Sequence, residues 1–268
     1  MHEREQAVEV GECDTACMLE ARFHFHRELN DFLARPLRGH AFACACAKTS
    51  TTKHMIEALG VPHTEVALIV KNGRPVGFDA QIAPDDVIDV YPAHHAPAAL
   101  AHGALLLRPP LHAAGLRFIA DAHLGGLAQL LRLAGFDTRY DNNFPDDEIE
   151  QLAHDETRVV LTRDRELLKR RTVLHGAYVR ALQPDEQWRE VAVRFDLASH
   201  VRAFRLCLMC NAPLRRAAPN EIDGRVPEGV RERHARFVTC DVCRRVFWEG
   251  SHWRRMRARI DALADANR

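Results

Sequence analysis

Residues 146–164 read DDEIEQLAHDETRVVLTRD, and this stretch predicts a helix followed by a buried strand. Its acidic opening suits the positive end of a helix dipole, and Ile149 and Ala153 lie four residues apart, on one helical face. Residues 159–161 form a short apolar run that ends at Thr162-Arg163-Asp164, which is typical of a buried strand. A helix that leads directly into a buried strand is part of the unit from which parallel α/β sheets are built.

The same alternation continues on both sides of this stretch. Helices are expected at 124–133 and 146–154, with a third beginning at 166–171, and strands at 116–120, 138–140, 159–161 and 177–181. Alternating strands and helices predict a parallel sheet with crossover helices. The fold class of residues 116–200 is therefore α/β, and ligands are expected at the carboxyl ends of its strands.

Residues 20–95 follow a different pattern. Phe23 and Phe25 alternate with polar residues, as in a half-buried strand, and Asn72-Gly73 is a strong hairpin signal. Ser50 and Thr51 can cap one helix, which Gly60 ends. The expected order of two strands, a helix and further strands describes a small mixed sheet curled around one helix. Residues 1–19 lack periodicity and are expected to be a disordered tail, and 96–115, rich in Ala, His and Pro, an interdomain linker.

The 20–95 segment resembles the ubiquitin-like β-grasp domains of the ThiS and MoaD sulfur-carrier type. Those carriers end in a Gly-Gly tail that is adenylated and thiocarboxylated. Here the last strand runs into Tyr91-Pro92-Ala93-His94-His95 and a long continuation. Sulfur-carrier chemistry needs a free terminal glycine, so we reject that function. A role in docking a protein partner remains.

Carboxylates gather at one edge of the expected α/β sheet. Two strands end on Asp121 and Asp164, and Asp146 opens the second helix. Carboxylates that converge repel one another unless a cation neutralises them, and hard oxygen ligands favour Mg²⁺ or Mn²⁺. Such an ion can activate water and hold a phosphate for phosphodiester hydrolysis. Taken singly, an aspartate after a strand can be a helix cap, and Asp147 and Glu148 suit a structural role in a first helical turn.

The motifs around these aspartates resemble those of PIN-domain ribonucleases. The resemblance rests on Asp146-x-x-Ile149-x-x-x-Ala153 followed by the strand that ends at Asp164. It implies that Asp146 and Asp164 belong to a metal site and that Asp121 matches the aspartate after the first strand. Many PIN nucleases have a further acid in an intervening helix, a place that Asp141 or Asp147 could fill. Arg163 could contact phosphate or pin a carboxylate in place.

A longer stretch is similar to a narrower family, the Mut-seven C-terminal RNases, whose prokaryotic members often carry an N-terminal ubiquitin-like domain. The matching segments are Asp121-Ala-His-Leu-Gly125-Gly-Leu-Ala128 through Leu131-Arg132, Gly135-Phe-Asp137 and Tyr140-Asp141-Asn142. The resemblance extends over about residues 20–260. It implies a PIN-like nuclease domain with a C-terminal zinc ribbon.

Four of the eight cysteines have the spacing of a zinc site. Cys207-x-x-Cys210 and Cys240-x-x-Cys243 supply four thiolates for a tetrahedral ion, and a closed four-thiolate site is structural. Cys44 and Cys46 share a strand face and are expected to pack as small apolar residues. Cys13 and Cys17 lie in the tail, and their role stays open. Residues 201–260 are thus expected to form a zinc ribbon with a basic helix, followed by a tail at 261–268.

The formal charge is zero, but it is unevenly distributed. Residues 1–110 carry 10 basic and 14 acidic side chains, 111–196 carry 12 and 15, and 197–268 carry 15 and 8. The basic end suits a polyanion such as RNA, or it is a solvated arginine-rich face. Four arginines of a basic helix could track an RNA backbone: Arg254, Arg255, Arg257 and Arg259. In the Gly-Ser-His segment before it, His252 could transfer a proton or hold phosphate, or else cap and pack.

We interpret the sequence as a metal-dependent ribonuclease with RNA as its substrate. The alternative is a non-catalytic RNA-binding or adaptor protein, which would not need carboxylates gathered on one edge. No stretch approaches the roughly 20 consecutive apolar residues that span a bilayer, and no signal peptide is evident. The expected location is therefore the cytoplasm.

Overall fold

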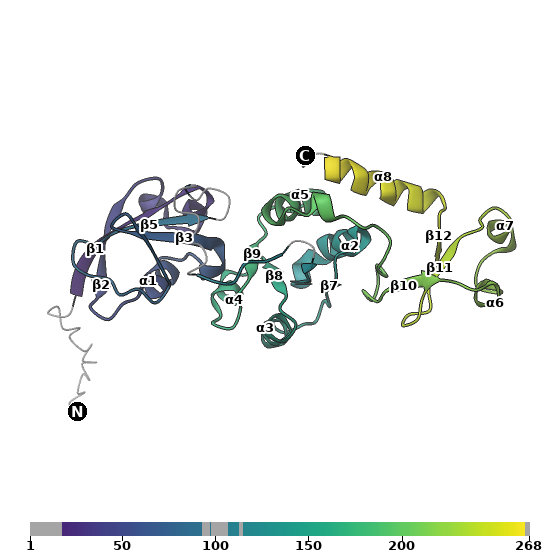
Figure 1. Cartoon of the computed structure of the whole chain (residues 1–268), viewed down its shortest axis with the longest axis horizontal. Coiled ribbons are helices and arrows are strands. Elements are labelled where there is room, and N and C mark those ends of the chain that lie inside the picture. The colour runs from purple at the N-terminus through teal and green to yellow at the C-terminus, as the bar shows by residue number, and fades with distance from the viewer. Residues whose placement is uncertain (1–17, 93–96, 98–106, 113–114, 266–268) are drawn as a thin grey trace, which may run out of the picture.

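The computed structural model describes residues 18–92, 97, 107–112 and 115–265. Within these, three units lie in a row: an N-terminal β-sheet domain, a central α/β domain and a C-terminal cysteine-bearing sheet (Figure 1). Residues 1–17 of the expected tail, with Cys13 and Cys17, lie outside the described residues, as does most of the expected linker. Met18 and Leu19, which we expected to end the tail, instead begin the first strand. The three-part fold predicted from the sequence is confirmed.

The N-terminal domain is a five-stranded sheet in the order β2-β1-β5-β3-β4. β1 and β5 pair in parallel at its centre, and the other neighbours are antiparallel. Alternate residues of β1 are buried, so Ala21, Phe23 and Phe25 face the core that the helix covers. The elements are β1 (Met18–Phe25), β2 (Phe42–Ala47), α1 (Thr52–Ala58), β3 (Val66–Lys71), β4 (Arg74–Val76) and β5 (Val87–Pro92).

The helix cap, the hairpin turn and the two cysteines predicted in this domain are found as expected. The Thr51 side chain accepts a hydrogen bond from the His54 amide and caps α1. Asn72 and Gly73 both have positive φ, which the tight turn between β3 and β4 requires. Cys46 is buried and Cys44 half-buried on the same face of β2, and burial raises the pKa of the Cys46 thiol to about 11. These two cysteines therefore pack as apolar residues.

The central sheet has the order β7-β6-β8-β9, and all its pairs are parallel. Alternation within β6 divides the core, because Phe118 and Ala120 pack with α2 and α5, whereas Ile119 packs with α3 and α4 on the opposite face. The elements are β6 (Phe118–Ala120), α2 (Gly125–Ala134), β7 (Thr138–Arg139), α3 (Asp146–Asp155), β8 (Val159–Thr162), α4 (Arg165–Lys169), β9 (Gly176–Tyr178) and α5 (Pro184–Phe195). Helix α5 is not among the elements that we expected.

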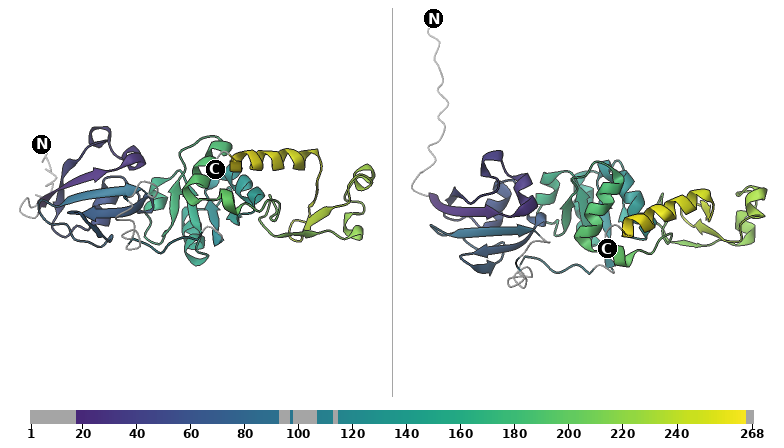
Figure 2. Two further views of the ribbon diagram at one scale, coloured as in Figure 1. Left: turned by 45° about the horizontal axis from the view of Figure 1, so that its top comes forward. Right: turned by 90° about the horizontal axis from the view of Figure 1, so that it is seen from above.

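The C-terminal unit is a three-stranded antiparallel sheet in the order β10-β11-β12. Its elements are β10 (Leu214–Arg216), α6 (Pro219–Ile222), α7 (Glu228–Arg231), β11 (Phe237–Cys240), β12 (Val246–Trp248) and α8 (Ser251–Asp265). Residues 261–265, which we expected to belong to a tail, instead continue α8. Helix α8, drawn in yellow, runs back from this three-stranded sheet, called the ribbon below, to the central domain (Figure 2). There Ile260 is fully buried in the core beside α2 and α5. No helix in the described ranges is long and apolar enough to cross a membrane.

The N-terminal and central domains are joined by buried polar contacts. The Glu65 side chain, 1% exposed, accepts hydrogen bonds from the Tyr178 amide at 2.8 Å and from Arg194 at 2.7 Å. His63 contacts the Val173 carbonyl oxygen at 2.9 Å. Arg165, next to the N-cap of α4, donates to the carbonyl oxygen of Phe32 and lies over its ring. The two domains are therefore packed against each other.

Candidate active site and metal centre

Two of the three predicted catalytic aspartates are linked at the carboxyl edge of the central sheet. Asp121 follows β6, and its two carboxylate oxygens accept hydrogen bonds from the Ala122 amide at 2.6 Å and the Thr162 hydroxyl at 2.7 Å. The same hydroxyl accepts one from the Asp164 amide at 2.9 Å. Thr162 is fully buried at the end of β8, the strand beside β6. One threonine therefore fixes the spacing between the two aspartates.

Asp164 is also a helix cap. Its Oδ1 accepts a hydrogen bond from the Glu166 amide at 2.7 Å, which opens α4. The capping role that the sequence allowed is thus present. The residue is exposed, and one capping bond leaves the rest of the carboxylate's acceptor capacity for a ligand.

Asp146, the third predicted residue, faces a cation instead of the other two aspartates. Its Oδ2 lies 3.4 Å from Arg170, whose guanidinium also contacts Asp147 and, at 2.8 Å, Glu150. Hydrogen bonds to Asp147 and Glu150 hold the pKa of Arg170 above its ordinary value. Arg170 therefore offsets part of the negative charge at the start of α3. Arg170 could not be predicted from the sequence, because it lies 24 residues from Asp146 and no local spacing connects them.

The three aspartates do not form a closed set of metal ligands in this structure. Among the described residues, two groups of three or more candidate ligands have all their ligand atoms within 4.8 Å of one another: the four C-terminal cysteines, and His24, His26 and Asp89. A magnesium ion commonly uses one or two carboxylates and keeps several waters. The linked pair Asp121 and Asp164 fits that mode.

The further residues predicted as possible members of the site make contacts of their own; they are Asp141, Asp147, Arg163 and His252. Asp141 accepts a hydrogen bond from the Asn143 amide at 2.9 Å and so stabilises its own turn. Asp147 is 91% exposed and contacts Arg170. Arg163 lies 3.5 Å from the Ala181 carbonyl oxygen, past the end of β9. His252 is exposed in the first turn of α8 and lines a groove beside the ribbon, to which none of the three aspartates contributes.

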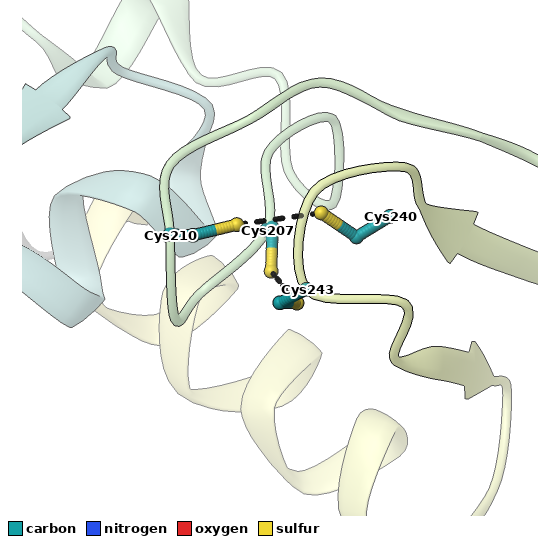
Figure 3. A group of neighbouring side chains, drawn as sticks. All are labelled: Cys207, Cys210, Cys240 and Cys243. Carbon is teal, nitrogen blue, oxygen red and sulfur yellow. Dashed lines mark hydrogen bonds between the residues drawn. The ribbon is translucent and has the colours of Figure 1, made fainter.

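The four C-terminal cysteines meet between two matching loops (Figure 3). The sulfur atoms of Cys207 and Cys243 are 3.5 Å apart, and those of Cys210 and Cys240 are 3.3 Å apart. Zn–S bonds of about 2.3 Å in a tetrahedron put sulfur atoms roughly 3.8 Å apart, so a zinc ion fits with a slight expansion. The cluster can therefore bind zinc.

The backbone of both loops is organised in the same way. Asn211 follows one Cys-x-x-Cys pair and Arg244 follows the other, with φ of 64° and 62°, and their amides donate to the carbonyl oxygens of Cys207 and Cys240 at 2.9 Å. Burial acts to raise the pKa of Cys240, but hydrogen bonds from the Cys243 and Val242 amides and from Cys210 lower it to about 7. Backbone donors aimed at sulfur therefore stabilise a thiolate at Cys240, whereas burial raises the pKa of Cys207 and of Cys210.

Comparison with known protein families agrees with this arrangement. The model of the Mut7-C RNAse domain matches residues 116–260, which is more than half of the chain. The chain belongs to the Mut7-C RNAse domain family. The model of the Mut7-C ubiquitin domain matches residues 18–97. No match was found among curated proteins or among solved structures. The resemblance inferred from the sequence is confirmed, and membership supports a nuclease-like function.

Within the Mut7-C domain, a buried arginine fastens the cysteine loops to the α/β core. Arg132 of α2 is 4% exposed and donates to the carbonyl oxygens of Leu208 and Met209 at 3.1 and 2.9 Å, and of Thr138 at 2.9 Å. Asn211 makes a second connection, to Asp137 and to the Thr138 amide. The signal for Arg132 was its place between Leu131 and Leu133 in an otherwise apolar stretch, where a charge needs several acceptors.

A groove of the Mut7-C domain lies between the ribbon and α8. Its volume is about 520 Å³, and its aromatic wall includes Phe204 and Trp253, whose rings stack at 4.6 Å, with Phe247 and Trp248. Arg236 and Arg257 line the same groove. Arg254 and Arg255, on the basic helix, have no ion pair among the described residues. Aromatic rings beside arginines are the usual surroundings of single-stranded nucleic acid.

Proposed function

We propose that this Mut7-C protein is a metal-dependent, PIN-like ribonuclease that hydrolyses RNA phosphodiester bonds at the edge carrying Asp121, Asp146 and Asp164. The observation that carries the proposal is the hydrogen-bonded chain from Asp121 through Thr162 to Asp164 at the carboxyl ends of neighbouring parallel strands. Ligands of such sheets bind at this edge.

The side chains at this edge of the sheet would have different roles. Asp121 and Asp164, with Asp146, would hold Mg²⁺ or Mn²⁺, which when bound supplies an acidified water and charge neutralisation at the phosphate. Arg163 and Arg170 bring positive charge to the same edge, where they can orient a phosphate by hydrogen bonding. Thr162 positions the two aspartates and is not itself placed to meet the substrate, because it is fully buried.

We further propose that the cysteine cluster holds a structural zinc ion and that the neighbouring groove binds the single-stranded part of the RNA. The aromatic wall offers stacking surfaces, and the charge of the C-terminal segment attracts phosphates. Four thiolates leave no coordination position for a substrate, so this zinc would contribute stability and shape.

The test is incubation of the purified full-length protein with labelled single-stranded and hairpin RNAs, and with DNA of the same sequence, in Mg²⁺, in Mn²⁺ and in chelator. We expect RNA cleavage that requires Mg²⁺ or Mn²⁺ and that chelator abolishes. Intact RNA together with tight binding would favour an adaptor. Cleavage unaffected by chelator would contradict the metal dependence.

A further inference from the structure

A second cluster of metal-type ligands lies on the N-terminal sheet, far from the cysteines in sequence. His24 is on β1, His26 follows its last residue, and Asp89 is directly opposite His24 on the parallel strand β5. Phe23, Phe25, Ile88 and Val90 point to the core from the same strands. Alternation along a strand therefore places all three candidate ligands on the outer face.

The three candidate ligand atoms lie within 4.8 Å of one another, and two of their separations are close to those between ligands of a small metal ion. His24 Nδ1 lies 3.4 Å and His26 Nε2 lies 2.9 Å from Oδ1 of Asp89. Two ligands bound tetrahedrally at about 2.0–2.1 Å are roughly 3.3 Å apart. The two observed separations bracket this value. An ion could therefore enter with small side-chain movements that replace the direct contacts with the carboxylate.

The rings are already oriented toward the carboxylate. His26 stacks on Tyr91, with centroids 4.0 Å apart and planes 5° from parallel, and the His24 ring lies 4.1 Å from the His26 ring. The side chains of His24, His26 and Asp89 are 34%, 24% and 29% exposed. The cluster is thus held in place on one side and reachable by an ion from solvent on the other.

We propose that His24, His26 and Asp89 form a second metal site, which takes a divalent transition ion such as Zn²⁺, Co²⁺ or Ni²⁺. Two imidazoles and one carboxylate suit ions of intermediate softness and select against Mg²⁺, which prefers oxygen ligands alone. Three protein ligands leave a coordination position for water or an external ligand, in contrast to the closed cysteine site. The proposal is independent of the nuclease activity.

The competing arrangement is a carboxylate that accepts hydrogen bonds from two imidazoles. In that case both ring nitrogens facing Asp89 carry protons, whereas metal binding requires free lone pairs on them and moves the protons to the opposite nitrogens. Imidazole ¹⁵N spectra recorded with and without zinc distinguish the two states. We expect zinc to shift the nitrogen resonances of His24 and His26 together.

The decisive measurement is calorimetric titration of Zn²⁺ into full-length protein that carries no histidine tag and already contains one zinc per chain. We expect the wild type, titrated in excess Mg²⁺ so that the acidic edge is already occupied, to bind one further equivalent. His24→Gln and Asp89→Asn should weaken this step by at least about tenfold, because even the outer-shell partners of metal ligands contribute roughly 10–100-fold. His54→Gln, which alters an exposed histidine on α1, is the matched control and should bind like the wild type.

Circular dichroism of each variant verifies that the sheet is intact, and ¹⁵N spectra of the wild type supply a readout that needs no variant. The proposal is overturned if the wild type binds no further zinc. It is equally overturned if a further equivalent persists unchanged in both His24→Gln and Asp89→Asn, since the ion would then lie elsewhere.

Discussion

Replacing Thr162 by valine tests whether its hydroxyl organises the acidic edge. The hydroxyl donates to Asp121 at 2.7 Å and accepts from the Asp164 amide at 2.9 Å, and the side chain is fully buried. Valine has nearly the same shape, so the substitution removes these two hydrogen bonds and opens little space. A bond to a charged group contributes about 1.5–3 kcal/mol and a neutral one about 0.5–1.5 kcal/mol.

We therefore expect Thr162→Val to lower the free energy of unfolding by about 2–4 kcal/mol. At roughly 2–4 °C per kcal/mol for a unit of this size, the melting temperature should fall by about 4–16 °C. RNA cleavage at a temperature where the variant is still folded should drop by at least about tenfold, because aspartates that lose their spacing bind the metal less well.

Thr162→Ser is the matched control, since it keeps the hydroxyl and loses one methyl group, at a cost of about 1 kcal/mol. The assays are thermal melting and Mn²⁺-dependent cleavage of a labelled RNA, made in parallel on the three proteins. The proposed role of Thr162 is refuted if Thr162→Val has the melting temperature and the cleavage rate of the wild type. It is also refuted if serine and valine reduce cleavage equally.

Three further predictions concern the two sites and their connection. Asp164→Asn should reduce metal-dependent RNA cleavage by orders of magnitude with little change in melting temperature. Asp147→Asn should cleave RNA nearly as fast as the wild type. Equal cleavage rates in the two variants would show that Asp164 is not part of the site. Elemental analysis should find one zinc bound to the four cysteines of the wild type, and Cys240→Ser should lose it and destabilise the C-terminal sheet. A variant that keeps its zinc and its melting curve would contradict the assignment. Burial acts to raise the pKa of Asp137, but hydrogen bonds from Arg158 and Asn211 lower it below its ordinary value. This carboxylate therefore stabilises the fold above its unfolded pKa of about 4, and that stability is lost as the pH falls through the lower folded value. Urea unfolding followed against pH should show a weaker acid dependence in Asp137→Asn, and an identical profile would exclude this contribution.

The order of strands and helices could be predicted because apolar periodicity is a local property. Helix α5 was predictable in the same way, since Trp188, Val191 and Ala192 have helical spacing and Pro184 suits its first turn. That Asp121 and Asp164 share an edge followed from the parallel topology, and the Thr162 bridge shows them linked there. Their role as metal ligands stays a prediction.

The tertiary partners of these sites could not be predicted. Arg170 reaches Asp146, and Arg132 reaches carbonyl groups 76 and 77 residues away, and neither pairing follows any spacing in the sequence. The same holds for His26 and Asp89, which are 63 residues apart and meet because β1 and β5 pair at the centre of the sheet. Periodicity identifies which face a residue occupies, whereas strand order decides what it meets.

The burial of Glu65 between the first two domains would affect where an RNA substrate is cleaved. A ubiquitin-like module on a free tether samples many orientations, and a nuclease guided by it would cut at scattered positions. Glu65 instead joins its domain to β9 and α5 of the nuclease domain. The orientation of the ubiquitin-like domain relative to the nuclease domain is therefore fixed. Any molecule bound to the ubiquitin-like domain would therefore lie at a fixed distance from the acidic edge. If that molecule positioned the RNA, cleavage would give products of regular length, set by the geometry of the chain.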